Sequence, residues 1–227
     1  MSDKIIISAS LMCADLMNLG ADILQLKEAD TDYLHLDVMD GHFVENITLG
    51  LDCCKQTTQY GIPRDIHLLV SHPDKYINIL NLNEGDIFQI HYESEADIIS
   101  IAQKVHQNKA LFGLVLNPHT PIETTINYLP YIDVVTLMMI TPGFAGQTMK
   151  EGMVDKIKEL RKFLDTNLHS NILIEVDGNV NVHNVPIMFE NGARIFVAGT
   201  SSVFKKDTSI REGSILLRQC ILKGEQK

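Results

Sequence analysis

Short apolar runs alternate with longer amphipathic segments from one end of the chain to the other. Eight of these runs have the length of a β-strand, and many are apolar at consecutive positions instead of at every second one. Such runs are typical of parallel strands that are covered on both faces. The pattern predicts strands at residues 4–10, 33–39, 64–70, 86–92, 111–117, 133–139, 171–177 and 194–200.

The segments between the predicted strands carry apolar residues at helical spacing. Strict alternation of strand and helix implies parallel strands joined by crossovers, so the sequence predicts an α/β fold, a single (β/α)8 TIM barrel forming one domain over residues 1–227. An open doubly wound sheet is the alternative, but "ISASLMCADL" lacks the glycine-rich turn that it would need after an early strand. The clearest helical patterns lie within residues 14–29, 96–108, 153–164 and 207–223.

The composition narrows the class of partner and the cellular compartment. The formal net charge is −10, which argues against a nucleic acid, because proteins that bind nucleic acids need a basic surface. No apolar stretch approaches about 18 residues, so no membrane span is expected. The cysteines fit neither a zinc motif nor a disulfide framework, which favours reduced thiols and a cytoplasmic protein. They are Cys13, Cys53, Cys54 and Cys220.

Ionisable side chains interrupt three of the predicted strands near their carboxyl ends. His35 and Asp37 share one face of the second predicted strand. His67 lies near the end of the third, and Asp177 ends the seventh. In a barrel these ends meet at the mouth, where two imidazoles and two carboxylates would suit one divalent metal ion, Zn²⁺, Fe²⁺, Mn²⁺ or Co²⁺. A hydrogen-bonded core histidine is the alternative for each His alone, but the combination favours the metal site.

Four other histidines say less about the metal site. His91 and Glu93, at the end of the fourth predicted strand, either support the metal ligands from behind or are simply polar groups of the mouth. His42, His72 and His119 fall in predicted loops, where we expect them to be in contact with solvent.

Three predicted loops at the same end of the barrel carry glycine, at residues 141–147, 177–179 and 198–201. Glycine lets backbone N–H groups approach an anion closely, and barrel phosphate sites commonly lie at the last two of these loops. Each loop alone indicates only a tight turn, but three together favour a phosphate site. The candidate phosphate-binding residues are Gly143, Gly146, Gly178, Gly199, Thr200 and Ser201.

Seven segments stand out between about residue 6 and residue 205: "SLMCADL", "HLDVMDGHFVENITLG", "HLLV", "LNPHTPIE", "TPGFAGQ", "EVDGN" and "VAGTSSVF". In this order they resemble the ribulose-phosphate 3-epimerase family. The resemblance implies a (β/α)8 barrel and an isomerase of carbohydrate metabolism that epimerises a ketose phosphate at carbon 3.

The resemblance also implies roles for individual residues. His35, Asp37, His67 and Asp177 match the family's metal ligands, and the two aspartates also match its acid–base pair. Ser10 matches a serine that contacts substrate.

Three apolar positions are expected to line the substrate site. Met39 and Met138 match methionines of the family, and Leu69 stands where the family usually has another. Together they would form a water-poor cover over the substrate, although each is also compatible with plain core packing.

The expected reaction is a 1,1-proton transfer through an enediolate, with one carboxylate on each face of the reacting carbon. D-ribulose 5-phosphate to D-xylulose 5-phosphate is the expected conversion, with no membrane or nucleic-acid partner and a homo-oligomeric state typical of the family. Departures at Ala9, Glu45, Leu69 and Thr141 leave the sugar open. The segments "SLMC", "DGN" and "GTS" favour a subgroup that resembles D-allulose 6-phosphate 3-epimerase, which would yield D-fructose 6-phosphate.

Two other classes are weighed against the epimerase. A phosphosugar decarboxylase would need a cation beside the departing carboxylate, and no predicted strand end supplies a lysine. A non-catalytic phosphosugar-binding barrel would be expected to lack a carboxylate or a ligand, and none is missing.

Overall fold

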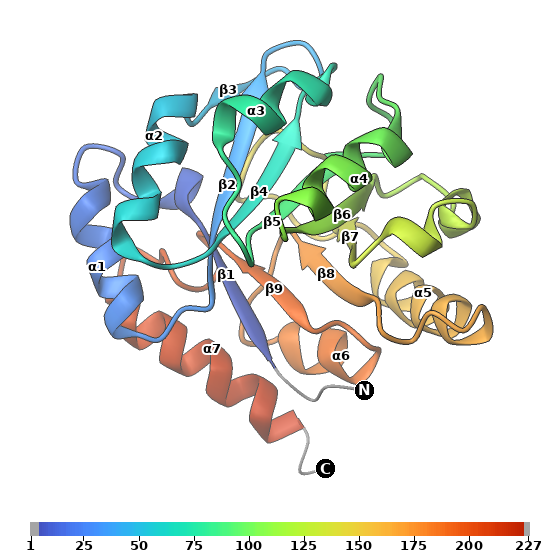
Figure 1. The fold of residues 1–227 in the computed structure, drawn as a ribbon. Helices are drawn as coiled ribbons and strands as arrows, with labels where there is room; N and C mark the ends of the chain where they lie inside the picture. Colours follow the sequence, from blue (N-terminus) through green and yellow to red (C-terminus); the bar gives the residue numbers. More distant parts are fainter. Residues whose placement is uncertain (1–4, 225–227) are drawn as a thin grey trace.

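Eight parallel strands close into a barrel in the computed structural model, which describes residues 5–224 (Figure 1). The hydrogen-bonded order is β1-β9-β8-β7-β6-β5-β4-β2, and pairing of β1 with β2 completes the ring. The predicted (β/α)8 barrel is therefore confirmed. The strands are β1 (Ile6–Ser10), β2 (Tyr33–Asp40), β4 (Arg64–Leu69), β5 (Ile87–His91), β6 (Leu111–Leu116), β7 (Val134–Met138), β8 (Leu173–Asp177) and β9 (Ile195–Ala198).

One short strand lies outside the barrel. It is β3 (Ile47–Thr48), which pairs antiparallel with the end of β2 and was not expected from the sequence. Each of the eight predicted strands matches a barrel strand; residue 4, where the first was expected to begin, lies outside the described residues.

Helices surround the barrel, as Figure 1 shows. Helix α1 begins at Leu19, later than the pattern from residue 14 suggests, because the Asp15 carboxylate accepts from the Met17 N–H and the Asn18 side chain and holds a turn there. The helices are α1 (Leu19–Glu28), α2 (Leu51–Gln56), α3 (Tyr76–Leu80), α4 (Ile98–Gln107), α5 (Met153–Thr166), α6 (Val185–Glu190) and α7 (Ile210–Gly224).

The connection between β6 and β7 departs from the regular alternation. It contains two short 3₁₀ helices, Ile122–Thr125 and Leu129–Tyr131, in place of the expected α-helix. Pro130 lies inside this segment, and proline cannot donate the backbone hydrogen bond that a continuous helix would need. The other long predicted helices are confirmed.

Side chains that point into the barrel form layers with different chemistry. At its amino-terminal end, Ile6, Ile87, Val134 and Ile195 form a separate apolar cluster that closes the floor. Above it lies a fully buried polar layer, and above that the ionisable residues near the carboxyl ends of the strands. The apolar floor means that the polar interior can open only toward the mouth. The polar layer contains Ser8, Asp65, Gln89, Thr136 and Glu175.

Two further expectations concern membrane spans and cysteines. Among residues 5–224, no helix is both long and apolar enough to cross a membrane. The four cysteines are free, as expected for reduced thiols.

Gly113 on β6 makes room for Gln89, the centre of the polar layer, and this predicts a stability effect. A Cβ atom at residue 113 would lie 2.7 Å from Gln89 Cγ, and Gln89 is fully buried and held by hydrogen bonds to Asp65 and Glu175. We expect Gly113→Ala to lower the free energy of unfolding by about 1–3 kcal/mol, measured by urea denaturation.

Gly50→Ala is the matched control. Gly50 has a φ of −56°, and nothing lies within 4 Å of a Cβ added there. Gly50 is the N-cap of α2, where alanine is less favourable than glycine, but alanine also restricts the unfolded chain, so we expect a change below about 1 kcal/mol. Equal stability of Gly113→Ala and the unsubstituted protein would show that Gln89 is not held in place.

Candidate functional site

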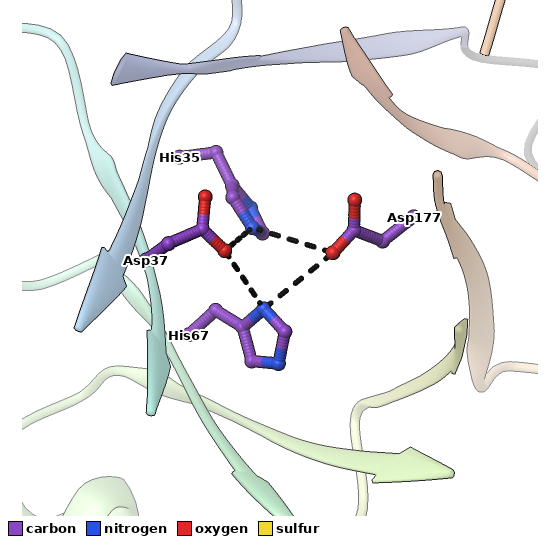
Figure 2. A group of neighbouring side chains, drawn as sticks. All are labelled: His35, Asp37, His67 and Asp177. Carbon is purple, nitrogen blue, oxygen red and sulfur yellow. Dashed lines mark hydrogen bonds and ion pairs between the residues drawn. The ribbon is translucent and has the colours of Figure 1, made fainter. Parts of the chain in front are cut away.

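The structure brings the four predicted ligands together at the barrel mouth, and Figure 2 shows their arrangement. Asp37 and Asp177 approach from opposite sides, with the rings of His35 and His67 between them. One ligand atom from each residue lies within 4.8 Å of all the others. Asp37 Oδ1 is 3.2 Å from His35 Nε2 and 3.1 Å from His67 Nδ1. Asp177 Oδ2 lies 3.9 Å and 3.6 Å from the same two nitrogens.

Strand register explains this convergence. Asp37 on β2 is directly opposite His67 on the neighbouring strand β4, so their side chains leave the sheet side by side. Strand β8, which carries Asp177, lies across the barrel from β4 in the strand order. His35 and His67 are fully buried and Asp37 is 4% exposed, whereas the Asp177 side chain is 15% exposed, so the cluster meets solvent mainly through Asp177.

A hydrogen bond from behind orients the ring of His35. Its Nδ1 lies 2.7 Å from Asp65 Oδ2, and because a carboxylate only accepts, Nδ1 carries a proton. Nε2 is then the nitrogen that faces both Asp37 and Asp177. A histidine that donates its second nitrogen to a carboxylate in this way is the usual arrangement at a metal site. The donor set of imidazole nitrogens and carboxylate oxygens therefore fits one divalent cation.

The pKa values show that the cluster attracts positive charge. Burial alone would lower the pKa of His35, but the carboxylates of Asp37 and Asp65 outweigh burial and raise it well above its usual value. Burial opposes ionisation of Asp37, yet the His35 imidazole holds the pKa of Asp37 well below its usual range. Burial raises the pKa of Asp177 to about 6, despite the nearby His35. A proton or a metal ion can supply the positive charge that the cluster of two carboxylates and two imidazoles favours.

The polar layer beneath the cluster contains residues that the sequence analysis missed. Gln89 Nε2 donates to Asp65 Oδ1 at 2.5 Å and to Glu175 Oε1 at 3.0 Å, and Ser8 Oγ donates to Asp65 Oδ2 at 2.7 Å. Thr136 Oγ1 donates to Gln89 Oε1. Asp65 and Gln89 stand two positions before His67 and His91, so strand alternation was the signal that could have found them.

His91 lies directly behind His67. His67 Nε2 is 2.9 Å from His91 Nε2, and His91 Nδ1 is 3.3 Å from Glu93 Oε2. Burial lowers the pKa of His91 to about 4, so its ring is neutral at pH 7. The sequence left two interpretations of His91, a group that supports a metal ligand from behind or a polar group of the mouth. The geometry agrees with the first, because His91 contacts His67 on the side away from the cluster. His42, His72 and His119 are exposed loop residues, as expected.

A cavity that is open to solvent lies above the cluster. Its wall contains all four predicted substrate-binding residues, Ser10, Met39, Leu69 and Met138. Ser10 Oγ donates to Asp37 Oδ2 at 2.8 Å, which joins the cavity wall to the cluster. All six predicted phosphate-binding residues also line it: Gly143, Gly146, Gly178, Gly199, Thr200 and Ser201.

Close packing explains two of the glycines in the cavity wall. Gly178 has a φ of +115°, and a Cβ there would lie 2.5 Å from Ile140 Cγ1. A Cβ at Gly199 would lie 3.0 Å from Cys13 Sγ. Wall residues that the sequence analysis did not single out come mostly from the loops after β1, β7 and β8: Met12, Cys13, Ile140, Pro142, Phe144, Ala145, Asn179 and Val180, with Val197 on β9.

The barrel resembles those of several solved structures. Thiamine phosphate pyrophosphorylase from Pyrococcus furiosus matches with a TM-score of 0.64, 11% identity and coverage of 97% of this chain and 96% of that one. A truncated form of 3-deoxy-D-arabino-heptulosonate 7-phosphate synthase from Thermotoga maritima also has a TM-score of 0.64, with 13% identity and coverage of 99% and 88%. At these identities the likeness supports the fold alone.

Closer relatives exist at the level of sequence. Ribulose-phosphate 3-epimerase from Bacillus subtilis is 35% identical over 204 residues, 88% of this chain and 93% of the relative. The protein of that name from Chlamydia pneumoniae is 33% identical over 227 residues, 98% of this chain and 96% of the relative. The model of the ribulose-phosphate 3-epimerase family matches residues 6–204. The chain therefore belongs to the ribulose-phosphate 3-epimerase family.

Proposed function

We propose that this protein is a metal-dependent isomerase that inverts carbon 3 of a ketose phosphate, converting D-ribulose 5-phosphate to D-xylulose 5-phosphate. One observation carries the proposal: Asp37 and Asp177 face each other across a point that two histidine rings also approach (Figure 2). Relatives named ribulose-phosphate 3-epimerase support the choice of substrate.

His35, Asp37, His67 and Asp177 would hold the metal ion, with Zn²⁺, Fe²⁺, Mn²⁺ and Co²⁺ as candidates. When bound, the ion would act as a Lewis acid that stabilises negative charge developing on the substrate oxygens. The polar layer keeps the ligands oriented, because Asp65 holds the ring of His35 from below.

The two aspartates would move the proton. Inversion requires removal of a proton from one face of carbon 3 and its return to the other, which one base cannot easily do. A substrate seated in the cavity above the cluster would have Asp37 on one side and Asp177 on the other. Their roles as base and acid would exchange with the direction of reaction. Ser10 donates to Asp37 and fixes the direction of its carboxylate.

The rest of the cavity would position the substrate. Among the described residues that line it, none is Lys or Arg, so a phosphate group there would be bound by backbone N–H groups and hydroxyls of the glycine-containing loops. Met39, Leu69 and Met138 supply apolar surface over the reacting carbon. The lack of a cationic side chain in this wall also disfavours the decarboxylase, which needs one beside its departing carboxylate.

The proposal also covers the oligomeric state and the cellular compartment of the protein. We expect a homo-oligomer in the cytoplasm, as the family resemblance and the free cysteines suggest. Light scattering on the purified protein measures the assembly directly.

Removing one nitrogen ligand tests the metal site. We expect His67→Ala to weaken Zn²⁺ binding at least tenfold, because the ion loses a buried imidazole, as measured by competition with a chelator. His72→Ala is the matched control, since this exposed histidine follows the same strand and pairs with the exposed Glu95 at 3.8 Å, outside the cluster. Unchanged Zn²⁺ affinity in His67→Ala would contradict the site.

Isotope exchange tests the two-face scheme. We expect Asp177→Asn to lower kcat by roughly 10²–10⁴-fold, because one of the two proton carriers is lost. In D₂O, this variant should still exchange the carbon 3 proton of one epimer through Asp37, without inversion. Mass spectrometry of each sugar phosphate separates the two outcomes. Near-full epimerisation by Asp177→Asn would be incompatible with the scheme.

Substrate length is the third test. The segments "SLMC", "DGN" and "GTS" line or adjoin the cavity and keep D-allulose 6-phosphate as a second candidate substrate. We expect a higher kcat/KM with D-ribulose 5-phosphate when both sugars are assayed on the same metal-loaded preparation. A strong preference for the six-carbon sugar would reverse the assignment.

A further inference from the structure

Three side chains form a hydrogen-bonded row that leads away from the ligand cluster. His67, whose Nδ1 faces Asp37 at 3.1 Å, has its other nitrogen 2.9 Å from His91 Nε2. The rings of His67 and His91 are nearly parallel, with centroids 5.0 Å apart. His91 is fully buried, and its remaining nitrogen faces the carboxylate of Glu93 at 3.3 Å. Neither His91 nor Glu93 belongs to the cluster of four ligands.

The order of donors and acceptors in this row follows from its outer end. A carboxylate only accepts, so His91 Nδ1 must donate to Glu93 Oε2. A neutral imidazole carries one proton, so His91 Nε2 is left as an acceptor. His67 Nε2 must then donate to it, because two unprotonated nitrogens would not approach to 2.9 Å. His67 Nδ1 is consequently the unprotonated nitrogen. It faces the Asp37 carboxylate, which also only accepts, so a cation is needed to balance this contact.

The carboxylate of Glu93 is itself fixed in orientation. Its other oxygen, Oε1, accepts from the backbone N–H of Asn117 at 3.1 Å and from Thr120 Oγ1. The loop that provides these donors is held in turn by Lys156, whose Nζ donates to the carbonyl oxygens of Asn117 and Thr120 at 3.1 Å and 2.7 Å. With Oε1 occupied by two donors, Oε2 is the oxygen that remains for His91.

We propose that Glu93 and His91 are positioning residues that fix His67 in the tautomer protonated at Nε2, so that Nδ1 is free to bind the divalent cation. The proposal rests on the proposed metal centre and extends it by one layer of residues toward the loop after β6. Glu93 would orient His67 as Asp65 orients His35, except that a second imidazole, that of His91, lies between His67 and the carboxylate.

Simple packing is the competing explanation for the row. His91 also lies against the ring of Phe43, with centroids 4.7 Å apart, so it could serve only to fill the mouth of the barrel. The two explanations differ in what they expect from a substitution that keeps shape but changes the direction of a hydrogen bond.

Glu93→Gln is such a substitution, and the surrounding donors decide how the new amide lies. The Asn117 N–H and Thr120 hydroxyl require an acceptor, so the amide oxygen would face them and the NH₂ group would face His91 Nδ1. The NH₂ group donates, which forces the protons of both histidines to the opposite nitrogens. His67 would then present N–H at Nδ1 to the metal site. We expect the Zn²⁺ dissociation constant of the full chain to rise by about 10–100-fold.

Glu93→Ala provides the comparison that packing alone would not reproduce. It removes the acceptor without imposing a donor, so His91 and His67 can still adopt the competent tautomers. We expect a smaller loss of Zn²⁺ affinity than in Glu93→Gln, although alanine is the larger change in shape. Glu95→Gln is the matched control, because this carboxylate is exposed and pairs with the exposed His72, outside the row. It should leave the affinity unchanged.

Chelator competition with Zn²⁺ on these variants, with the melting temperature as a check of folding, gives distinguishable outcomes. A larger loss in Glu93→Gln than in Glu93→Ala supports the proposal. Wild-type affinity in Glu93→Gln, or a larger loss in Glu93→Ala, overturns it while leaving the metal centre intact. Failure of the metal centre itself would appear separately, as unchanged affinity in His67→Ala.

A second measurement needs no substitution in the row. In the zinc-loaded protein with ¹⁵N-labelled histidine, NMR distinguishes protonated from unprotonated ring nitrogens. We expect His91 to carry its proton on Nδ1 and His67 on Nε2. A proton on Nε2 of His91 would contradict the proposed order.

Discussion

Two carboxylates and two imidazole nitrogens point at one another inside a barrel whose other end is closed by apolar side chains. Groups of this kind repel one another when they are buried together without positive charge, and burial removes most of the solvent that would screen them. The raised pKa of His35 is a direct expression of this excess of negative charge. The remaining features of the site follow from the need to hold these groups in place and to balance them with a cation.

The barrel holds these groups in place with stacked layers of inward-pointing side chains. The apolar floor prevents water from entering from below, and the polar layer above it satisfies the second nitrogen of His35 through Asp65. Gly113 leaves the space that Gln89 requires to connect Asp65 with Glu175. Orientation therefore comes from rigid strands at the centre, while the loops contribute the cavity walls that surround a substrate.

The sequence predicted the barrel and the four clustered side chains because both depend on short-range patterns. Strand alternation places His35 and Asp37 on one face, and parallel topology brings His67 and Asp177 to the same end. The absence of an α-helix between β6 and β7 was not predicted, since apolar spacing alone does not reveal a segment interrupted by Pro130.

The inner polar layer and the row behind His67 were harder to predict. Asp65 and Gln89 do follow strand alternation, but their function depends on partners from other strands. The sequence left His91 open between support from behind and a polar group of the mouth, because the choice depends on the loop after β6 folding back onto Glu93. Contacts of that kind are set by tertiary packing and not by local pattern.

Anomalous diffraction from crystals of the full chain grown with Zn²⁺ would locate the bound ion. We expect one strong zinc peak at the barrel mouth, about 2.0–2.2 Å from His35 Nε2, His67 Nδ1 and a carboxylate oxygen of each of Asp37 and Asp177. A peak elsewhere, with these four side chains left without a shared ion, would contradict the proposed metal site.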